Sequence, residues 1–147
     1  MPDQEDLLSD AEREALATVT APRAAPQKVL IVDDNQVARE ALAGYLKSKK
    51  VGCLTAQNAK RALACLKGEQ NIGLLITDLR MGPFDGLELI RQIRESDKAA
   101  LPIIIVSGDA DVPDAIAAMH LSVVDFLLKP IDLDKLMALV RKELGIS

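Results

Sequence analysis

The sequence predicts a doubly wound α/β domain, in which helices cover both faces of a parallel sheet, and three observations lead to this prediction. Five short apolar runs alternate with five segments of helical periodicity, as expected of repeated strand–helix units. The apolar runs are continuous, which is typical of parallel strands buried on both faces. Polar or charged residues follow four of the five runs, at the edge of such sheets where ligands bind.

The expected strands are short runs in which β-branched residues are frequent, a composition that favours extended structure. The second of them is the weakest, because it contains more small and polar residues than the others. The strands are expected at residues 29–32, 51–56, 72–77, 103–106 and 123–128.

The helices between these strands are expected at residues 36–49, 58–67, 86–95, 113–119 and 133–144. Asn58 and Asp132 are predicted N-caps, because their side chains can accept a hydrogen bond from the first turn. Gly145 is expected to end the last helix. The helices should pack their apolar stripes on the sheet, and Val37, Met119 and Met137 are assigned to these stripes.

The composition argues against several classes of function. Aromatic residues make up 2% of the chain and the net charge is −4, so neither a stacking platform nor a basic footprint for nucleic acid is expected. Two cysteines and one histidine make neither a disulfide framework nor a common zinc site. No apolar run approaches the roughly 18 residues of a membrane span. The acidic N-terminus lacks an apolar signal segment, so we expect a cytoplasmic protein.

Residues 1–27 carry all of the net charge, with six acidic and two basic residues, whereas residues 28–147 are balanced. Pro22 and Pro26 mark a linker, so we expect an acidic extension over 1–27 and a domain over 28–147. Ser9 and Glu12 fit a helix capping box, and an apolar stripe follows it. Two interpretations remain open: a solvated tail, or a short amphipathic helix that docks on its own domain, a second copy or a partner.

The polar residues at the strand ends predict a metal-assisted phosphoryl site. Asp33 and Asp34 follow the first strand, Asp78 the third, Ser107 the fourth and Lys129 the fifth. Adjacent carboxylates repel one another unless a cation neutralises them, and hard oxygen ligands suit Mg²⁺. A carboxylate beside that ion can act as a nucleophile toward a phosphoryl group, while an ammonium and a hydroxyl hold the phosphoryl oxygens.

The sequence resembles the receiver domain of bacterial two-component response regulators, the CheY-like family, from Lys28 to about Leu144. The resemblance lies in several short motifs taken in this order and spacing. They are Val29-Leu30-Ile31-Val32-Asp33-Asp34-Asn35, Leu75-Ile76-Thr77-Asp78-Leu79-Arg80-Met81, Asp85-Gly86, Val106-Ser107-Gly108 and Asp125-Phe126-Leu127-Leu128-Lys129-Pro130. The resemblance implies a flavodoxin-like (βα)₅ fold with strand order 2-1-3-4-5.

The resemblance also implies the role of each site residue. Asp78 matches the phosphoacceptor, which takes a phosphoryl group from a histidine kinase or a histidine phosphotransfer protein. Asp34 matches a direct Mg²⁺ ligand, Asp33 a neighbour that acts through water, and the backbone carbonyl of Arg80 the remaining protein ligand. Lys129 matches the site lysine. Such a domain assists its own phosphorylation and dephosphorylation and is not an enzyme for external substrates.

The same resemblance implies a switch. Ser107 matches the hydroxyl that moves toward the phosphoryl group, Phe126 the aromatic residue that then turns inward, and the bond from Lys129 to Pro130 is expected to be cis. The affected face, formed by the fourth helix, fifth strand and fifth helix of the domain, would contact a downstream protein. We expect no direct binding of nucleic acid or membrane, and the sequence leaves open whether the chain forms a homodimer.

Four positions depart from the family pattern: Gly82 before Pro83, Ser122, Phe126 in place of Tyr, and Arg80. Ser122 stands where the family usually has Gly, and we expect the turn to rearrange so that Ser avoids a positive φ angle. The side chain of Arg80 lies at the rim of the site, where it could shield or expose an acyl phosphate.

Other functions remain as alternatives. A phosphate sink, or a detached hybrid-kinase receiver, would accept phosphate without direct output. A Mg²⁺-dependent aspartyl phosphohydrolase would need an acid or base two residues after its nucleophile, where this chain has Arg80. A flavin or nucleotide binder would need a loop of backbone donors after the first strand, where Asp33 and Asp34 would repel phosphate.

Overall fold

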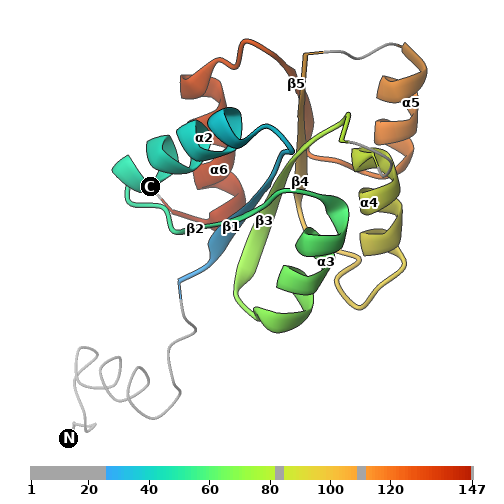
Figure 1. Ribbon diagram of the computed structural model, residues 1–147, viewed down its shortest axis with the longest axis horizontal. Helices are drawn as coiled ribbons and strands as arrows, with labels where there is room; N and C mark the ends of the chain where they lie inside the picture. Colours follow the sequence, from blue (N-terminus) through green and yellow to red (C-terminus); the bar gives the residue numbers. More distant parts are fainter. Residues whose placement is uncertain (1–25, 82–84, 109–111, 147) are drawn as a thin grey trace, which may run out of the picture.

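The computed structural model describes residues 26–81, 85–108 and 112–146, which form a five-stranded parallel sheet with helices on both faces (Figure 1). The strands are ordered β2-β1-β3-β4-β5, and every neighbouring pair is parallel. The fold class and the strand order expected from the sequence are therefore confirmed.

The elements alternate along the chain as predicted, with bounds shifted by one or two residues. The strands are β1 (Lys28–Val32), β2 (Cys53–Ala56), β3 (Ile72–Asp78), β4 (Ile103–Ser107) and β5 (Asp125–Leu128). The helices are α2 (Gln36–Ser48), α3 (Ala59–Gly68), α4 (Gly86–Arg94), α5 (Val112–His120) and α6 (Leu133–Leu144). The sequence also offers Asp109 and Asp111 as caps of the helix after β4, and both lie outside the described residues.

The core consists of two layers, one on each face of the sheet. Alternate residues of β1 point to opposite layers, with Leu30 and Val32 under α3, α4 and α5, and Val29 and Ile31 under α2 and α6. All four side chains are buried. This arrangement explains why the strands are continuous apolar runs, since neither face of the sheet is exposed to water.

Side-chain caps begin the helices for which the structure describes the preceding residue. Asn58 accepts a hydrogen bond from the Arg61 N–H at 2.8 Å, and Asp132 accepts one from Lys135 at 3.1 Å, as predicted. Asn35 and Asp85 cap α2 and α4 in the same way. Each capping residue stands directly before its helix, in the connection from the preceding strand. The caps therefore fix the residue at which each helix begins.

Three helices end in a Schellman motif, in which the residue after the helix has a positive φ angle. The positive-φ residues are Lys50 (φ 68°) after α2, Ser122 (φ 58°) after α5 and Gly145 (φ 68°) after α6. After α5, the Ser122 and Val123 N–H groups donate to Met119 and Ala118 respectively. The expected rearrangement at Ser122 is therefore wrong, because these hydrogen bonds hold the turn.

Two residues assigned to the core are exposed. The exposed fractions are 79% for Val37 and 74% for Met119, whereas Met137 is buried as predicted. Val37 lies in the first turn of α2, beyond the part of the helix that packs on the sheet, and Met119 lies on the outer side of α5. No helix in the described part of the chain is long and apolar enough to span a membrane.

Candidate functional site

The predicted site residues meet at the edge of the sheet where the strands end. Asp33 and Asp34 directly follow β1, Asp78 is the last residue of β3, and Ser107 is the last residue of β4. Lys129 directly follows β5. Parallel strands bring these ends to one edge, so residues up to 96 positions apart in the chain become neighbours.

Three carboxylates form the acidic part of the site. One oxygen atom from each of Asp33, Asp34 and Asp78 lies within 4.8 Å of the others. Asp33 is buried, Asp78 is half-buried and Asp34 is exposed, so the cluster opens to solvent on one side. Three hard oxygen donors with an open side match the preference of Mg²⁺, which binds few protein groups and keeps several water ligands.

Each of the two less exposed carboxylates is held by the main chain through one oxygen atom. The Asn35 N–H donates to Asp33 Oδ1 at 2.9 Å, and the Leu79 N–H donates to Asp78 Oδ1 at 2.7 Å. The other oxygen of each group faces Lys129, whose Nζ lies 3.5 Å from both Asp33 Oδ2 and Asp78 Oδ2. The ammonium group therefore bridges two acids that would otherwise repel each other.

Burial raises the pKa of Asp78 above the usual value of a carboxyl group. Lys129 opposes this effect and lowers the pKa, Asp33 raises it, and the Leu79 N–H lowers it. Burial dominates, so this carboxylate is less well solvated than an ordinary surface aspartate. A poorly solvated carboxylate beside a cation is a better nucleophile than a fully hydrated one.

The main chain after Asp78 is packed tightly against the start of α4. A Cβ atom at Gly86 would lie 2.2 Å from the carbonyl oxygen of Asp78, closer than any side chain can approach. The Gly86 N–H also donates to the Leu79 carbonyl at 2.7 Å. Gly86 thus lets α4 begin directly against the residue that carries the central carboxylate.

Ser107 and Phe126 are the two predicted switch residues. Ser107 is buried, and its carbonyl oxygen accepts a 2.9 Å hydrogen bond from the Lys129 N–H. Phe126 is half-buried and packs against the core layer under α3, α4 and α5. The peptide bond between Lys129 and Pro130 is cis, as expected.

One contact near the site was not predicted from the sequence. The guanidinium group of Arg80, two residues after Asp78, donates to the carboxylate of Asp114 on α5. These residues are 34 positions apart, and Asp114 gave no signal in the sequence beyond lying in the first turn of a helix. The Arg80 side chain therefore connects the end of β3 to α5.

Comparison with known families places most of the chain in one family. The model for the response regulator receiver domain matches residues 29–141. Among curated proteins, the two-component response regulator ORR11 of Oryza sativa subsp. indica is 37% identical over 80% of this chain and 80% of its own length. The C4-dicarboxylate transport transcriptional regulatory protein DctD of Pseudomonas aeruginosa is 38% identical, but the match covers 27% of that protein.

Solved structures show the same similarity. A response regulator receiver protein from Pseudomonas putida is 58% identical, with a TM-score of 0.80, and its whole length matches 82% of this chain. A receiver domain of an HD domain-containing protein from Pseudomonas fluorescens has a TM-score of 0.77 at 24% identity, which supports the fold alone.

Proposed function

This chain belongs to the response regulator receiver domain family, and from this premise we propose that it is a phosphoacceptor switch in a two-component phosphorelay. Asp78 would take a phosphoryl group from a histidine kinase or a histidine phosphotransfer protein. The observation that carries the proposal is the position of the Asp78 carboxylate, which lies between two other aspartates and the ammonium group of Lys129.

The chemistry follows from this position. An oxygen atom of Asp78 forms a bond to phosphorus, and the bond from phosphorus to the donor nitrogen breaks, leaving its electron pair on the donor imidazole. Asp34, Asp78 and the Arg80 carbonyl would hold Mg²⁺ directly and Asp33 would hold it through water, and the ion would supply positive charge to the phosphoryl oxygens. Lys129 can turn from the two carboxylates to the new phosphoryl group, since it lies at the limit of hydrogen-bond distance from both.

Phosphorylation would act on a face that is suited to protein binding. On α5, Ile116 and Met119 are 50% and 74% exposed, and Leu128 on the neighbouring edge strand is 63% exposed. Ser107 would move toward the phosphoryl group and Phe126 would turn inward, which would reshape the face formed by α5, β5 and α6. Exposed apolar side chains gathered on one face favour a protein partner, either a downstream protein or a second copy. The proposal retains the cytoplasmic location expected from the sequence.

Labelling with acetyl phosphate and Mg²⁺ tests the phosphoacceptor role. We expect one phosphoryl group per chain by intact-mass spectrometry, lost in Asp78→Asn and retained in the control Asp97→Asn, whose carboxylate is exposed and remote from the site. Labelling that survives Asp78→Asn would overturn the proposal. Repeated turnover of external phosphate esters would favour the phosphohydrolase instead.

Binding to partners captured from the source cell separates a switch from a phosphate sink. A switch should bind at least one partner with different affinity before and after phosphorylation. The reason is that a partner can respond to a change of conformation only if its affinities for the two conformations differ. Equal binding of every partner by phosphorylated protein and Asp78→Asn would favour the sink or a hybrid-kinase receiver.

A further inference from the structure

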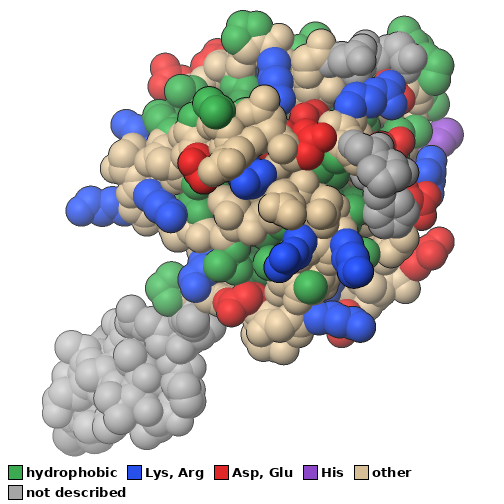
Figure 2. Space-filling view, viewed as in Figure 1, with side chains coloured by type: hydrophobic (Ala, Val, Ile, Leu, Met, Phe, Trp, Pro, Cys, Tyr) green, Lys and Arg blue, Asp and Glu red, His purple; other side chains and the backbone are tan. Residues whose placement is uncertain are grey.

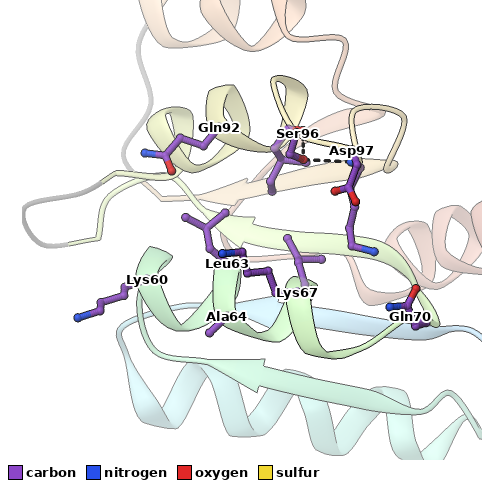
Figure 3. Close-up of a pocket in the computed structure, with 11 residues that line it drawn as sticks. Lys60, Leu63, Ala64, Lys67, Gln70, Gln92, Ser96 and Asp97 are labelled. Atoms are coloured by element: carbon purple, nitrogen blue, oxygen red, sulfur yellow. Dashed lines mark hydrogen bonds between the residues drawn. The ribbon is translucent and has the colours of Figure 1, made fainter.

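A groove lies between α3 and α4, and none of the carboxylates of the acidic cluster lines it. Its volume is about 610 Å³, and it is lined by side chains of α3, of α4 and of the loop that follows α4. Figure 3 shows Leu63 between the two helices, with Lys60 and Gln92 toward one end and Gln70 and Asp97 toward the other.

The groove has an apolar floor and a basic rim. Leu66 and Ile93 are buried in the floor, and Leu63 packs half-buried beside them. Three lysines and one aspartate line the rim, so its net charge is +2. They are Lys60, Lys67, Lys98 and Asp97. Figure 2 shows basic side chains gathered over α3 on this face.

The chain enters the domain next to this groove. The Asn71 side-chain amide donates to the Pro26 carbonyl at 3.0 Å, which ties the linker beside the end of α3. A second hollow of about 370 Å³ is lined by Gln27 and shares Asp97 and Lys98 with the groove. The two hollows share two lining residues, so the point where residues 1–25 join the domain lies near the groove.

Residues 1–25 have the composition that this groove would bind. They hold six acidic and two basic residues, a net charge of −4, which is opposite in sign to the rim. A helix begun by Ser9 would carry Ala11, Ala15, Leu16 and Val19 roughly on one face, with Leu8 directly before it, at the spacing of an amphipathic helix. Residues 20–25 would remain to connect it to Pro26, enough to reach roughly 23 Å from residue 19.

We infer that the groove between α3 and α4 is the docking site of the chain's own N-terminal segment. The apolar stripe of the segment covers Leu63, Leu66 and Ile93, and its acidic residues reach the lysines of the rim. Docking within one chain is favoured because a short linker holds the segment near the groove at a high effective concentration, on the order of millimolar. This inference does not depend on phosphorylation of Asp78.

A single introduced tryptophan tests the inference in the full-length chain, which has none of its own. Leu16→Trp lies in the apolar stripe, and we expect blue-shifted emission from a partly buried ring. Reversing the rim with Lys60→Glu and Lys67→Glu should shift the emission to the red. The control pair Lys47→Glu and Lys142→Glu, exposed on α2 and α6 across the sheet, should leave it unchanged.

A charge swap completes the test. Glu12→Lys and Glu14→Lys should also expose the ring, and combining them with the reversed rim should restore the blue-shifted emission. Restoration would show that the variants fold and that the two surfaces meet. Emission typical of an exposed ring in every variant, or buried emission that ignores the rim, would overturn the inference. Buried emission that disappears on dilution would assign the groove to a second copy instead.

Discussion

The guanidinium group of Arg80 lies 2.5 Å from the carboxylate of Asp114, which joins the residue two positions after Asp78 to the first turn of α5. The Asp114 side chain is 12% exposed and that of Arg80 is 46% exposed. The ion pair is therefore partly buried, with Asp114 the less exposed partner. It connects the loop beside the carboxylate cluster to a helix of the proposed output face.

Removing this ion pair should lower the stability of the protein and the protection of α5 against hydrogen exchange. We expect Arg80→Met to lower the free energy of unfolding by about 1 kcal/mol, the upper end for ion pairs that keep some contact with water. The control Arg91→Met removes an exposed pair with Glu88 within α4, and a loss of about 0.3 kcal/mol is expected there. Denaturant unfolding gives both values, and hydrogen exchange should accelerate in α5 for Arg80→Met alone. Equal losses in the two variants would contradict the connecting role of Arg80.

The close contact at Gly86 predicts opposite effects for two glycine substitutions. Gly86→Ala would place a methyl group against the Asp78 carbonyl, and we expect a loss of about 1–3 kcal/mol together with slower phosphorylation. Gly44→Ala, in the middle of α2 with open space around it, should stabilise the protein by about 0.5–1 kcal/mol. Thermal unfolding of the two variants checks the sign of each change. A stable, rapidly phosphorylated Gly86→Ala would show that the loop moves aside without cost.

The three Schellman motifs predict which residue each turn prefers. A side chain at positive φ costs about 1–2 kcal/mol, and glycine avoids this cost. Part of the advantage is lost because glycine makes the unfolded chain more flexible. Ser122→Gly and Lys50→Gly should therefore each stabilise the protein by about 0.5–1 kcal/mol. Gly145→Ala should destabilise by about 1 kcal/mol for the same reason. Denaturant midpoints measured at constant slope check all three. Destabilisation by Ser122→Gly would mean that the hydroxyl group contributes more than the backbone strain costs.

The raised pKa of Asp78 predicts how stability depends on pH in the absence of metal. Burial favours the protonated carboxyl in the folded state, so its contribution to stability is full below the unfolded-state pKa and is lost as the pH rises through the folded-state pKa. Asp78→Asn should therefore be more stable than wild type at pH 8, with a difference that shrinks as the pH falls. Unfolding with a chelator present measures this difference, and Asp97→Asn serves as the control. A less stable Asp78→Asn at pH 8 would contradict the dominant effect of burial.

The carboxylate cluster predicts stabilisation by Mg²⁺. Binding to the folded state alone adds about 1.4 kcal/mol when the free ion exceeds its dissociation constant tenfold. Asp34→Asn should lose this gain without losing stability in chelator, because Asp34 is exposed. Asp97→Asn should retain the gain. Thermal unfolding in chelator and in Mg²⁺ tests both variants, and an equal gain in Asp34→Asn would remove that residue from the ligand set.

The sequence predicts the strands and the residues at their ends well, because both depend on short, local patterns. The run from Ile103 to Val106 is typical of a strand buried between two layers, and the positions of the acids at the ends of β1 and β3 follow from strand position. Met119 shows where this reasoning fails. Helical periodicity gives the apolar positions of α5 but does not show which of them the sheet covers and which stay exposed for another surface.

Contacts between distant segments could not be predicted from the sequence, because local patterns do not show which distant residues become neighbours. Arg94 donates hydrogen bonds to the carbonyl oxygens of Leu121 and Ser122, 27 and 28 positions away, and so supports the turn after α5. Nothing in the composition of that turn indicates this partner. A serine at positive φ therefore looks unfavourable in the sequence and is accommodated in the fold.

The 2.9 Å hydrogen bond from the Lys129 N–H to the Ser107 carbonyl has a mechanical consequence. It connects the end of β4 to the start of the segment after β5. The Ser107 hydroxyl and the Lys129 ammonium group therefore belong to two segments whose main chains are hydrogen-bonded to each other. β5 is an edge strand, with β4 as its one described neighbour. A displacement of β5 would therefore disturb the hydrogen bonds of one strand pair and not of two. If Ser107 moves as proposed, this hydrogen bond would transmit the movement to the segment after the edge strand.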